Sequence, residues 1–462
     1  MIRHYNFDKY TGFRKKFQIF SFDGYDFQVN GQELTVEFHF SIDNLIFFKP
    51  QTKFVINSHI INSNPEDLKI LLFHIGMVEL ISYWKAVCPQ KVVIKPFQLS
   101  QDQIKWWKKL WFNGLGEFFW LNSISATEED FLHIENASDI PFAKVNFNTA
   151  GNEVIVPIGG GKDSAVSAEL LLNIGASVRP MLVNPRDAMT QTVNAAGISE
   201  DKSFVIHRTI DPELIRLNSE GYLNGHTPFS SLLAFQSLIP AYFSGISDIA
   251  LSNESSANEA TVPGTNINHQ YSKSFEFERD FRQYAQTWLN SKFNYFSLLR
   301  PLSELQIAYI FSKLTAHHPH FRSCNAGSKS NIWCGKCPKC LFTAIILLPF
   351  VGPDAIMEIF GDDLFSNQDL FPIFRQLTGM DSIKPFECVG TPSEINLALS
   401  YSIDYHFNGK ELPFLIDFFK KSEKYYSIEK NHFFLSIYQN FDTQHFLSDS
   451  MYEQLKKYIR TV

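Results

Sequence analysis

The stretch IGGGKDS at 158–164 decides the fold of this chain. The apolar segment VIVPI at 154–158 leads into it and is typical of a short buried strand. The segment AVSAELLLNIG at 165–175 follows and predicts a helix that ends at Gly175. Consecutive glycines between a strand and a helix let backbone N–H groups approach an anion, and the helix N-terminus adds partial positive charge. The stretch therefore predicts an anion-binding turn.

Two familiar phosphate loops do not fit this turn. A Walker A loop needs Ser or Thr directly after its Lys, whereas Lys162 is followed by Asp163. The dinucleotide spacing G-x-G-x-x-G is not met either. Asp163 can hold Mg²⁺ or orient the loop, and the Ser164 hydroxyl can donate to a phosphate oxygen and cap the helix.

The turn resembles the PP-loop of the N-type ATP pyrophosphatases, usually written S-G-G-x-D-S, with Gly159 in place of the first Ser. The resemblance implies that ATP binds here and is split between its α and β phosphates in an adenylylation. It also implies that adenine lies beside the end of the next strand, VRPMLVNP at 178–185. The ATP-binding residues expected on this basis are Gly159, Gly160, Gly161, Lys162, Asp163, Ser164, Val183 and Asn184.

The segments around the turn alternate between strands and helices. SFVIHRTI at 203–210 and DIALSNE at 248–254 are further strand candidates, which favours parallel βαβ units with right-handed crossovers. We therefore expect an α/β protein whose parallel-sheet core spans 146–350. The PP-loop resemblance makes that core similar to the adenine nucleotide alpha hydrolases. Residues 351–462 are expected to form a mostly helical C-terminal region.

Residues 1–145 are expected to form a separate α+β N-terminal domain. Strand-like segments between Phe17 and Phe48 are broken at Asp23-Gly24 and at Asn30-Gly31, and the latter pair is a hairpin signal. The alternation in ELTVEFHF at 33–40 predicts a half-buried strand. Helices are expected at 65–86 and 101–112.

Four of the six cysteines cluster within a short segment. Their spacing, with two overlapping C-x₂-C pairs and one distal Cys, is typical of four-thiolate ligation of Zn²⁺. Four protein ligands leave no open position, so a structural zinc is favoured over a catalytic one. Redox C-x-x-C chemistry is the competing interpretation. The expected ligands are Cys324, Cys334, Cys337 and Cys340.

Bulk composition narrows the function classes. The net charge of −7 over 462 residues argues against a broad nucleic-acid surface. No signal peptide and no run of about 18 apolar residues is expected, so no membrane span is predicted. The cysteine layout favours a reducing, cytoplasmic compartment. The sequence does not indicate an oligomeric state.

Polar segments between the turn and the cysteines supply the remaining candidates. They are GHTPFSS at 225–231, LSNESSANE at 251–259 and NHQYSKSFEFE at 268–278. Polar residues directly after an apolar strand belong at the carboxyl edge of a parallel sheet, where α/β proteins bind ligands.

These segments resemble the MurL family, the ATP-dependent UDP-N-acetylmuramoyl-L-alanyl-L-glutamate epimerases of bacterial peptidoglycan synthesis. The resemblance also includes CGKCPKCLF at 334–342 and KPFECVGT at 384–391, and it runs the length of the chain. Ser255 stands where many relatives have a basic residue. The implied substrate is a UDP-muramoyl dipeptide, and the implied cofactors are ATP, Mg²⁺ and structural Zn²⁺. Substrate-binding residues expected from these segments are Asn253, Glu254, Glu259 and Tyr271.

The implied reaction is chemically coherent. A proton beside a carboxylate is hard to remove because a second negative charge would develop. Adenylylation turns the carboxylate into an electron-withdrawing mixed anhydride, so a side-chain base can then invert the α-carbon. Hydrolysis returns the carboxylate, with AMP and pyrophosphate released. The expected catalytic residues are Lys162, Asp163, His226, His269 and Lys273.

Three rival hypotheses stay open at this point. One is a synthase similar to 7-cyano-7-deazaguanine synthase, which captures an adenylated carboxylate with ammonia. Another is a tRNA thiolation enzyme, which the acidic charge and the isolated Cys88 and Cys388 disfavour. The third is a module that binds ATP as a sensor without catalysis.

Overall fold

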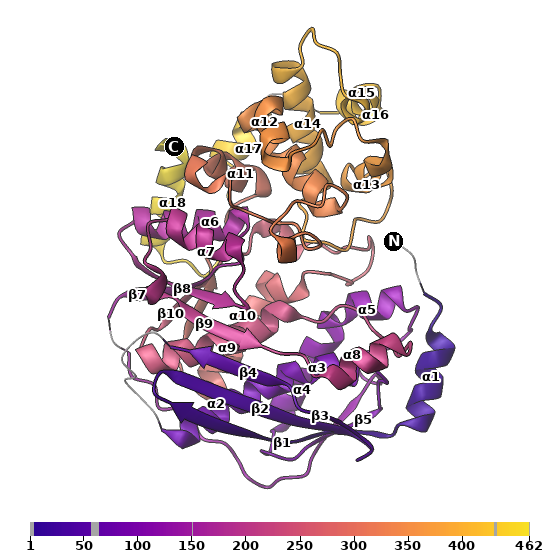
Figure 1. The fold of residues 1–462 in the computed structure, drawn as a ribbon, viewed down its shortest axis with the longest axis vertical. Helices are drawn as coiled ribbons and strands as arrows, with labels where there is room; N and C mark the ends of the chain where they lie inside the picture. The colour runs from indigo at the N-terminus through magenta and orange to yellow at the C-terminus, as the bar shows by residue number, and fades with distance from the viewer. Residues whose placement is uncertain (1–3, 57–63, 150, 429–431, 462) are drawn as a thin grey trace. The chain divides into compact units, whose positions relative to one another are not determined.

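The structure, a computed structural model, describes residues 4–56, 64–149, 151–428 and 432–461. It is a mixed α/β protein (Figure 1). Its chain divides into two compact units. Unit 1 comprises Met1–Ile155, Lys202–Ile249 and Asn266–Tyr295. Unit 2 comprises Val156–Asp201, Ala250–Thr265 and Phe296–Val462. The three consecutive domains expected from the sequence stay a prediction.

Unit 1 is built on a mixed sheet. Within it the strands follow the order β9-β4-β2-β1-β5-β6, and β3 also pairs with β2. The pairs β1–β2, β2–β3, β2–β4 and β4–β9 are antiparallel, and β1–β5 and β5–β6 are parallel. The strands are β1 (Ile19–Asn30), β2 (Glu33–Ile42), β3 (Ile46–Phe48), β4 (Gln51–Val55), β5 (Lys91–Ile94), β6 (His133–Asn136) and β9 (Phe204–Arg208).

The β1–β2 hairpin confirms the Asn30-Gly31 turn. Asn30 pairs with Glu33, and Gly31 has the left-handed φ of +60° that such a turn requires. The break predicted at Asp23-Gly24 is wrong, because β1 continues through it. A β-bulge between Phe22 and Gly24 takes up the irregularity without ending the strand.

Helices pack on one face of this sheet, with α2 beside α9 (Figure 1). Gly76 in α2 lies directly against β1 and β2, since a Cβ there would come within 2.4 Å of the Phe22 ring. The ring of Phe73, on the same helix, stacks on that of Phe22 at 5.7 Å. The helices are α1 (Phe7–Lys16), α2 (Pro65–Glu79), α3 (Ile81–Trp84), α4 (Gln101–Gly114), α5 (Gly116–Leu121), α8 (Pro212–Ser219), α9 (Phe229–Ser244) and α10 (Phe275–Tyr284).

At three places the chain passes from unit 1 to unit 2 within a strand. These strands are β7 (Glu153–Pro157), β10 (Asp248–Leu251) and β11 (Asn294–Ser297). The pairing of β10 with β7 is parallel, as predicted for the strand candidates at 154–158 and 248–254. Beyond β7, the Ile158 N–H donates to Met181 in β8 (Ser177–Val183) at 3.0 Å. The predicted strand–turn–helix at 154–175 is confirmed, and Gly175 follows the helix with a φ of +82°.

The rest of unit 2 is helical, which confirms the prediction for its C-terminal part. Its α-helices are α6 (Lys162–Asn173), α7 (Asp187–Ala195), α11 (Glu304–Lys313), α12 (Pro338–Phe360), α13 (Phe371–Leu377), α14 (Pro392–His406), α15 (Phe414–Lys420), α16 (Glu423–Tyr426), α17 (His432–Tyr438) and α18 (Asp449–Thr461). Short 3₁₀ turns, including η2 (Ser255–Asn258) here and η3 (Tyr271–Lys273) in unit 1, connect some of the elements.

Helix α12 is long and apolar enough to cross a membrane by length and composition alone. Its mean hydropathy of 1.9 and its length satisfy that criterion. However, 67% of the apolar window is buried inside the protein, and Gly352 interrupts the helix with a φ of 79°. Such burial is typical of the core helix of a globular protein.

Candidate active site

The glycine turn of unit 2 lies between β7 and α6 in a confined space. Gly160 has a φ of +77°, and a Cβ on it would come within 2.9 Å of the backbone of Ala188 and Met189 in α7. The carbonyl of Gly160 accepts a hydrogen bond from the Arg322 N–H at 2.7 Å. A Cβ on Gly159, in contrast, would meet nothing within 4 Å. The middle glycine is therefore required by the fold, whereas a Ser would fit at Gly159, as in the PP-loop pattern.

Helix α6 begins at Lys162, three residues before the predicted start at 165, with Gly161 as its N-cap. The capping role predicted for Ser164 is wrong. Its hydroxyl donates to the Gly161 carbonyl at 3.1 Å, and Gly161 occupies the N-cap position instead. The first N–H groups of a helix lack intrahelical acceptors, so the start of α6 directly after the glycine turn suits an anion.

Lys162 is buried between two carboxylates. Its Nζ donates to Asp163 Oδ1 and to Glu304 Oε2, and its side chain is only 3% exposed. Burial lowers the pKa of Lys162, but the Asp163 and Glu304 carboxylates outweigh it and raise that pKa above its ordinary value. Lys162 is therefore a fixed cation at the start of α6.

Glu304 was not expected from the sequence, and it is held by a second carboxylate. Its backbone N–H donates to Glu394 Oε1 at 2.7 Å, and Glu394 Oε2 accepts from the Thr391 N–H and hydroxyl. Burial raises the pKa of both Glu304 and Glu394. Gly390 lies close to Glu304, since a Cβ on it would be 3.1 Å from Glu304 Cγ. The segment at 384–391 thus supports the carboxylate that holds Lys162.

The other predicted residues of unit 2 lie at strand ends. Val183 ends β8, and Asn184 follows with a φ of +48°. Beyond β10, the Asn253 side chain donates to Ser297 Oγ at 3.0 Å, and the buried Glu254 accepts from Ser256 at 2.8 Å. Glu259 pairs with Lys384 at 2.8 Å. These residues do follow strands, and their binding roles stay predictions.

In unit 1 the structure brings His226 and His269 together. Their ring centroids are 4.5 Å apart. His226 precedes α9, and His269 precedes η3. Both direct Nδ1 at one oxygen of Glu117, at 2.5 Å from His269 and 3.5 Å from His226. Glu117, in the first turn of α5, is 8% exposed and lies 152 positions from His269 in the sequence. We call these three residues the histidine cluster.

Charged neighbours set the electrostatics of the histidine cluster. Burial, together with His269, Lys85 and Lys273, lowers the pKa of His226 to about 3. His226 is therefore neutral at physiological pH. Burial also lowers the pKa of Lys85 to about 8, and its ammonium donates to the carbonyl of Gly225.

Two further predicted residues come from η3. Lys273 acts on His226 through its charge. Tyr271 is buried, and this burial raises the pKa of its hydroxyl. The structure thus places three of the predicted catalytic residues, His226, His269 and Lys273, in unit 1.

The histidine cluster is also a donor set that a metal could use, with all ligand atoms within 4.8 Å. Ligands about 2.1 Å from one ion lie roughly 3 Å or more from each other. The 2.5 Å between His269 Nδ1 and Glu117 Oε2 is shorter and describes a direct hydrogen bond. This hydrogen bond joins the imidazole of His269 directly to the carboxylate of Glu117.

The four predicted cysteines converge in unit 2. The Sγ atoms of Cys324 and Cys337, of Cys334 and Cys340, and of Cys337 and Cys340 lie 3.5–3.8 Å apart, and none of the four forms a disulfide. Sulfurs about 2.3 Å from one tetrahedral Zn²⁺ are roughly 3.8 Å apart, so the cluster fits that ion. The Gly327 N–H donates to Cys324 Sγ at 3.1 Å. Cys337 is the N-cap of α12, so a metal here would join the start of that helix to the preceding loop.

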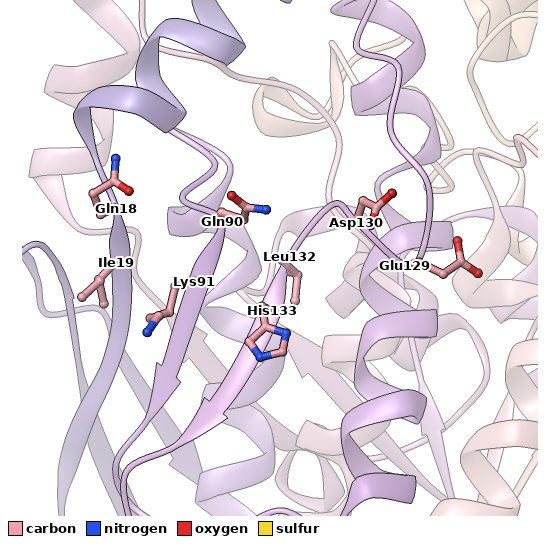
Figure 2. A pocket seen from close by; sticks show the side chains of 8 residues that line it. All are labelled: Gln18, Ile19, Gln90, Lys91, Glu129, Asp130, Leu132 and His133. Atoms are coloured by element: carbon pink, nitrogen blue, oxygen red, sulfur yellow. The ribbon is translucent and has the colours of Figure 1, made fainter.

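A cavity of about 530 Å³ lies elsewhere in unit 1, beside the first residues of β5 and β6 (Figure 2). Its lining includes Gln90, Glu129 and His133, and none of the predicted site residues. Ligand sites of parallel sheets form at the carboxyl ends of strands, whereas this cavity lies at the amino ends. We assign it no role in the chemistry.

Two family descriptions match this chain. The MurL N-terminal domain matches residues 12–298, which include the glycine turn and the histidine cluster. The MurL C-terminal domain matches residues 320–426, which include the four cysteines.

Individual relatives agree with the family match. A protein of Salinispora tropica is 35% identical over 326 residues, covering 69% of this chain and 70% of its own length. A protein of Xanthomonas oryzae pv. oryzae is 32% identical over 340 residues, which cover 69% of this chain and 71% of its own length. Each is named as a UDP-N-acetyl-alpha-D-muramoyl-L-alanyl-L-glutamate epimerase.

Proposed function

The chain belongs to the MurL family, and on that premise we propose that it epimerises the terminal L-Glu of UDP-N-acetylmuramoyl-L-alanyl-L-glutamate to D-Glu. The reaction consumes ATP and releases AMP and pyrophosphate. It belongs to cytoplasmic synthesis of peptidoglycan precursors, so the enzyme is an isomerase whose partner is a small molecule. Neither nucleic acid nor a membrane is part of the proposed reaction.

One observation carries the proposal. The region shared with the epimerases contains two histidines that the fold brings onto one buried carboxylate. A buried carboxylate bonded to an imidazole is the arrangement of a general base, which an epimerase needs and a simple ATP-binding module does not.

The first proposed step is adenylylation of the α-carboxylate. A carboxylate oxygen attacks the α-phosphorus of ATP, and pyrophosphate leaves. The backbone N–H groups of the glycine turn and of α6 bind the departing phosphates, and Lys162 stabilises their charge. Asp163 would hold Mg²⁺, which supplies charge neutralisation at the phosphates. The confined Gly160 and the start of α6 directly after the glycine turn support this assignment.

The second proposed step is inversion of the α-carbon. The histidine cluster takes the α-proton from one face, and a donor returns a proton to the other. Lys273 is our candidate for that donor, since its charge already acts on His226. Asn253, Glu254, Glu259 and Tyr271 are proposed to bind the substrate. Water then attacks the acyl carbon of the adenylate, and AMP leaves.

The four-cysteine cluster is proposed to hold one structural Zn²⁺. The sulfur spacing and the absence of a disulfide support this role. Elemental analysis of the purified chain is expected to give one zinc per molecule, and a folded chain without metal would contradict the assignment.

The test uses the purified full chain with the UDP-muramoyl dipeptide, ATP and Mg²⁺. We expect pyrophosphate release together with conversion of L-Glu to D-Glu, read by chiral analysis after acid hydrolysis of the product. Omission of ATP should abolish the conversion. Recovery of only L-Glu alongside AMP would instead indicate a synthase or ligase and contradict the proposal.

A further inference from the structure

Glu117 determines how the histidine cluster can handle a proton. Its Oε2 accepts from Nδ1 of His269 at 2.5 Å, inside a site where Glu117 is 8% exposed. An imidazole that donates from Nδ1 to a carboxylate carries its lone pair on Nε2. The carboxylate also stabilises the imidazolium that forms when Nε2 takes a proton.

The two histidines share one carboxylate oxygen of Glu117. The rings of His226 and His269 are 4.5 Å apart at their centroids, and both turn Nδ1 towards the same oxygen. We therefore treat the histidine cluster as one unit.

Within that unit His269 is better placed to receive the proton. Its contact with Glu117 is 1 Å shorter than that of His226, 2.5 Å against 3.5 Å. Lys85 and Lys273 also oppose a positive charge on His226. His226 thus stays neutral and packs beside the base.

We propose that Glu117 is a positioning residue that keeps a proton on Nδ1 of His269, so that Nε2 of His269 takes the α-proton from one face of the substrate. The inference rests on the proposed function. The proton moves from the α-carbon to Nε2, and the electron pair left on carbon delocalises into the adenylated carboxyl. A proton delivered to the other face restores the carbon with inverted configuration.

The test compares Glu117→Gln with Asp67→Asn, a matched control. Both changes turn a buried carboxylate of unit 1 into an amide, and Asp67 accepts hydrogen bonds from Tyr242 and Asn146 rather than from a histidine. The amide at position 117 can donate as well as accept, so it permits the wrong tautomer of His269.

Two steps are measured in each variant. Substrate-dependent exchange of labelled pyrophosphate into ATP reports adenylylation, and deuterium incorporation at the α-carbon in D₂O reports proton removal. In Glu117→Gln we expect deuterium incorporation to fall at least about 100-fold, as orienting carboxylates of catalytic triads do. Pyrophosphate exchange should stay within about twofold of wild type. Glu117→Asp, which keeps the charge, should recover part of the deuterium rate, and Asp67→Asn should preserve both rates.

The pH profile gives a readout that a purely structural residue would not move. Glu117 contacts both histidines, and Lys85 and Lys273 act on His226 through their charge. In Glu117→Gln the loss of the negative charge disfavours the imidazolium of His269. The acid limb of the pH profile of kcat/KM, measured by deuterium incorporation, should therefore move to lower pH in this variant.

Three results would overturn the inference. Deuterium incorporation in Glu117→Gln could equal that of wild type, or both steps could fall together in that variant. Elemental analysis could also find an ion that wild type holds and Glu117→Gln loses, which would make the cluster a metal site. If wild type itself exchanges neither pyrophosphate nor the α-proton, the proposed function fails, and this result is distinct from a defect confined to the variant.

Discussion

Lys162 shows how one residue can serve both stability and chemistry. The sequence predicts it as a phosphate-binding cation, and the structure adds that its ammonium is held by Asp163 and Glu304 inside the protein. Breaking a buried ion pair by removing one partner leaves an uncompensated charge, which costs about 3–5 kcal/mol. The two roles can be separated because a second substitution can remove the stranded carboxylate.

We predict that Lys162→Met lowers the free energy of unfolding by about 3 kcal/mol near pH 8. Burial raises the pKa of Glu304, so its folded carboxyl binds protons more readily than the unfolded one. Without Lys162, stability should therefore fall as pH rises above the ordinary carboxyl range, and the loss should shrink in acid. Urea unfolding at several pH values measures this effect.

The control for that prediction is Lys162→Met combined with Glu304→Gln. The double variant has no stranded carboxylate at 304, so most of the lost stability should return. Neither variant should release pyrophosphate, because both lack the cation proposed for the phosphates. A double variant as unstable as the single one would show that the ion pair is not the cause.

At the scale of elements, the sequence predicts local structure well where a pattern is continuous. The hairpin at Asn30-Gly31, the strand before the glycine turn and the helix after it are all confirmed. The break at Asp23-Gly24 was wrong because a bulge absorbs one residue while the ladder continues. A capping role for Ser164 was wrong because α6 begins at Lys162, which places Ser164 inside the helix.

The glycine turn provides a prediction with an internal control. Gly160→Ala forces a side chain into the left-handed region and against the backbone of α7, 2.9 Å away. We expect it to lower the melting temperature and to abolish pyrophosphate exchange. Gly159→Ala points into open space and should preserve the melting temperature. Thermal melting of both variants distinguishes them, and equal melting would contradict the assigned packing.

At the scale of the whole molecule, contacts between segments distant in the sequence could not be predicted. His226 and His269 stand out as polar residues near predicted strand ends, whereas Glu117 lies in the aromatic segment of α5 and carries no motif. Glu304 likewise carries no motif and is simply the first residue of α11, whose N-cap is Ser303. Their roles depend on partners 152 and 142 positions away, which only the folded chain reveals.

The two sets of candidate residues also divide between the compact units. The glycine turn, Lys162 and the four cysteines belong to unit 2, and the histidine cluster belongs to unit 1. Adenylylation and proton transfer are thus assigned to different parts of the chain. A chemical link between the two steps is the central claim, because the α-proton becomes removable only once the carboxylate carries AMP.

Oxygen transfer tests that link most directly. The dipeptide is prepared with ¹⁸O in the α-carboxylate of its glutamate and incubated with the enzyme, ATP and Mg²⁺ in unlabelled water. If the carboxylate attacks the α-phosphorus and water later attacks the acyl carbon, each AMP should carry one ¹⁸O in its phosphate. AMP that contains no ¹⁸O while D-Glu accumulates would contradict the account.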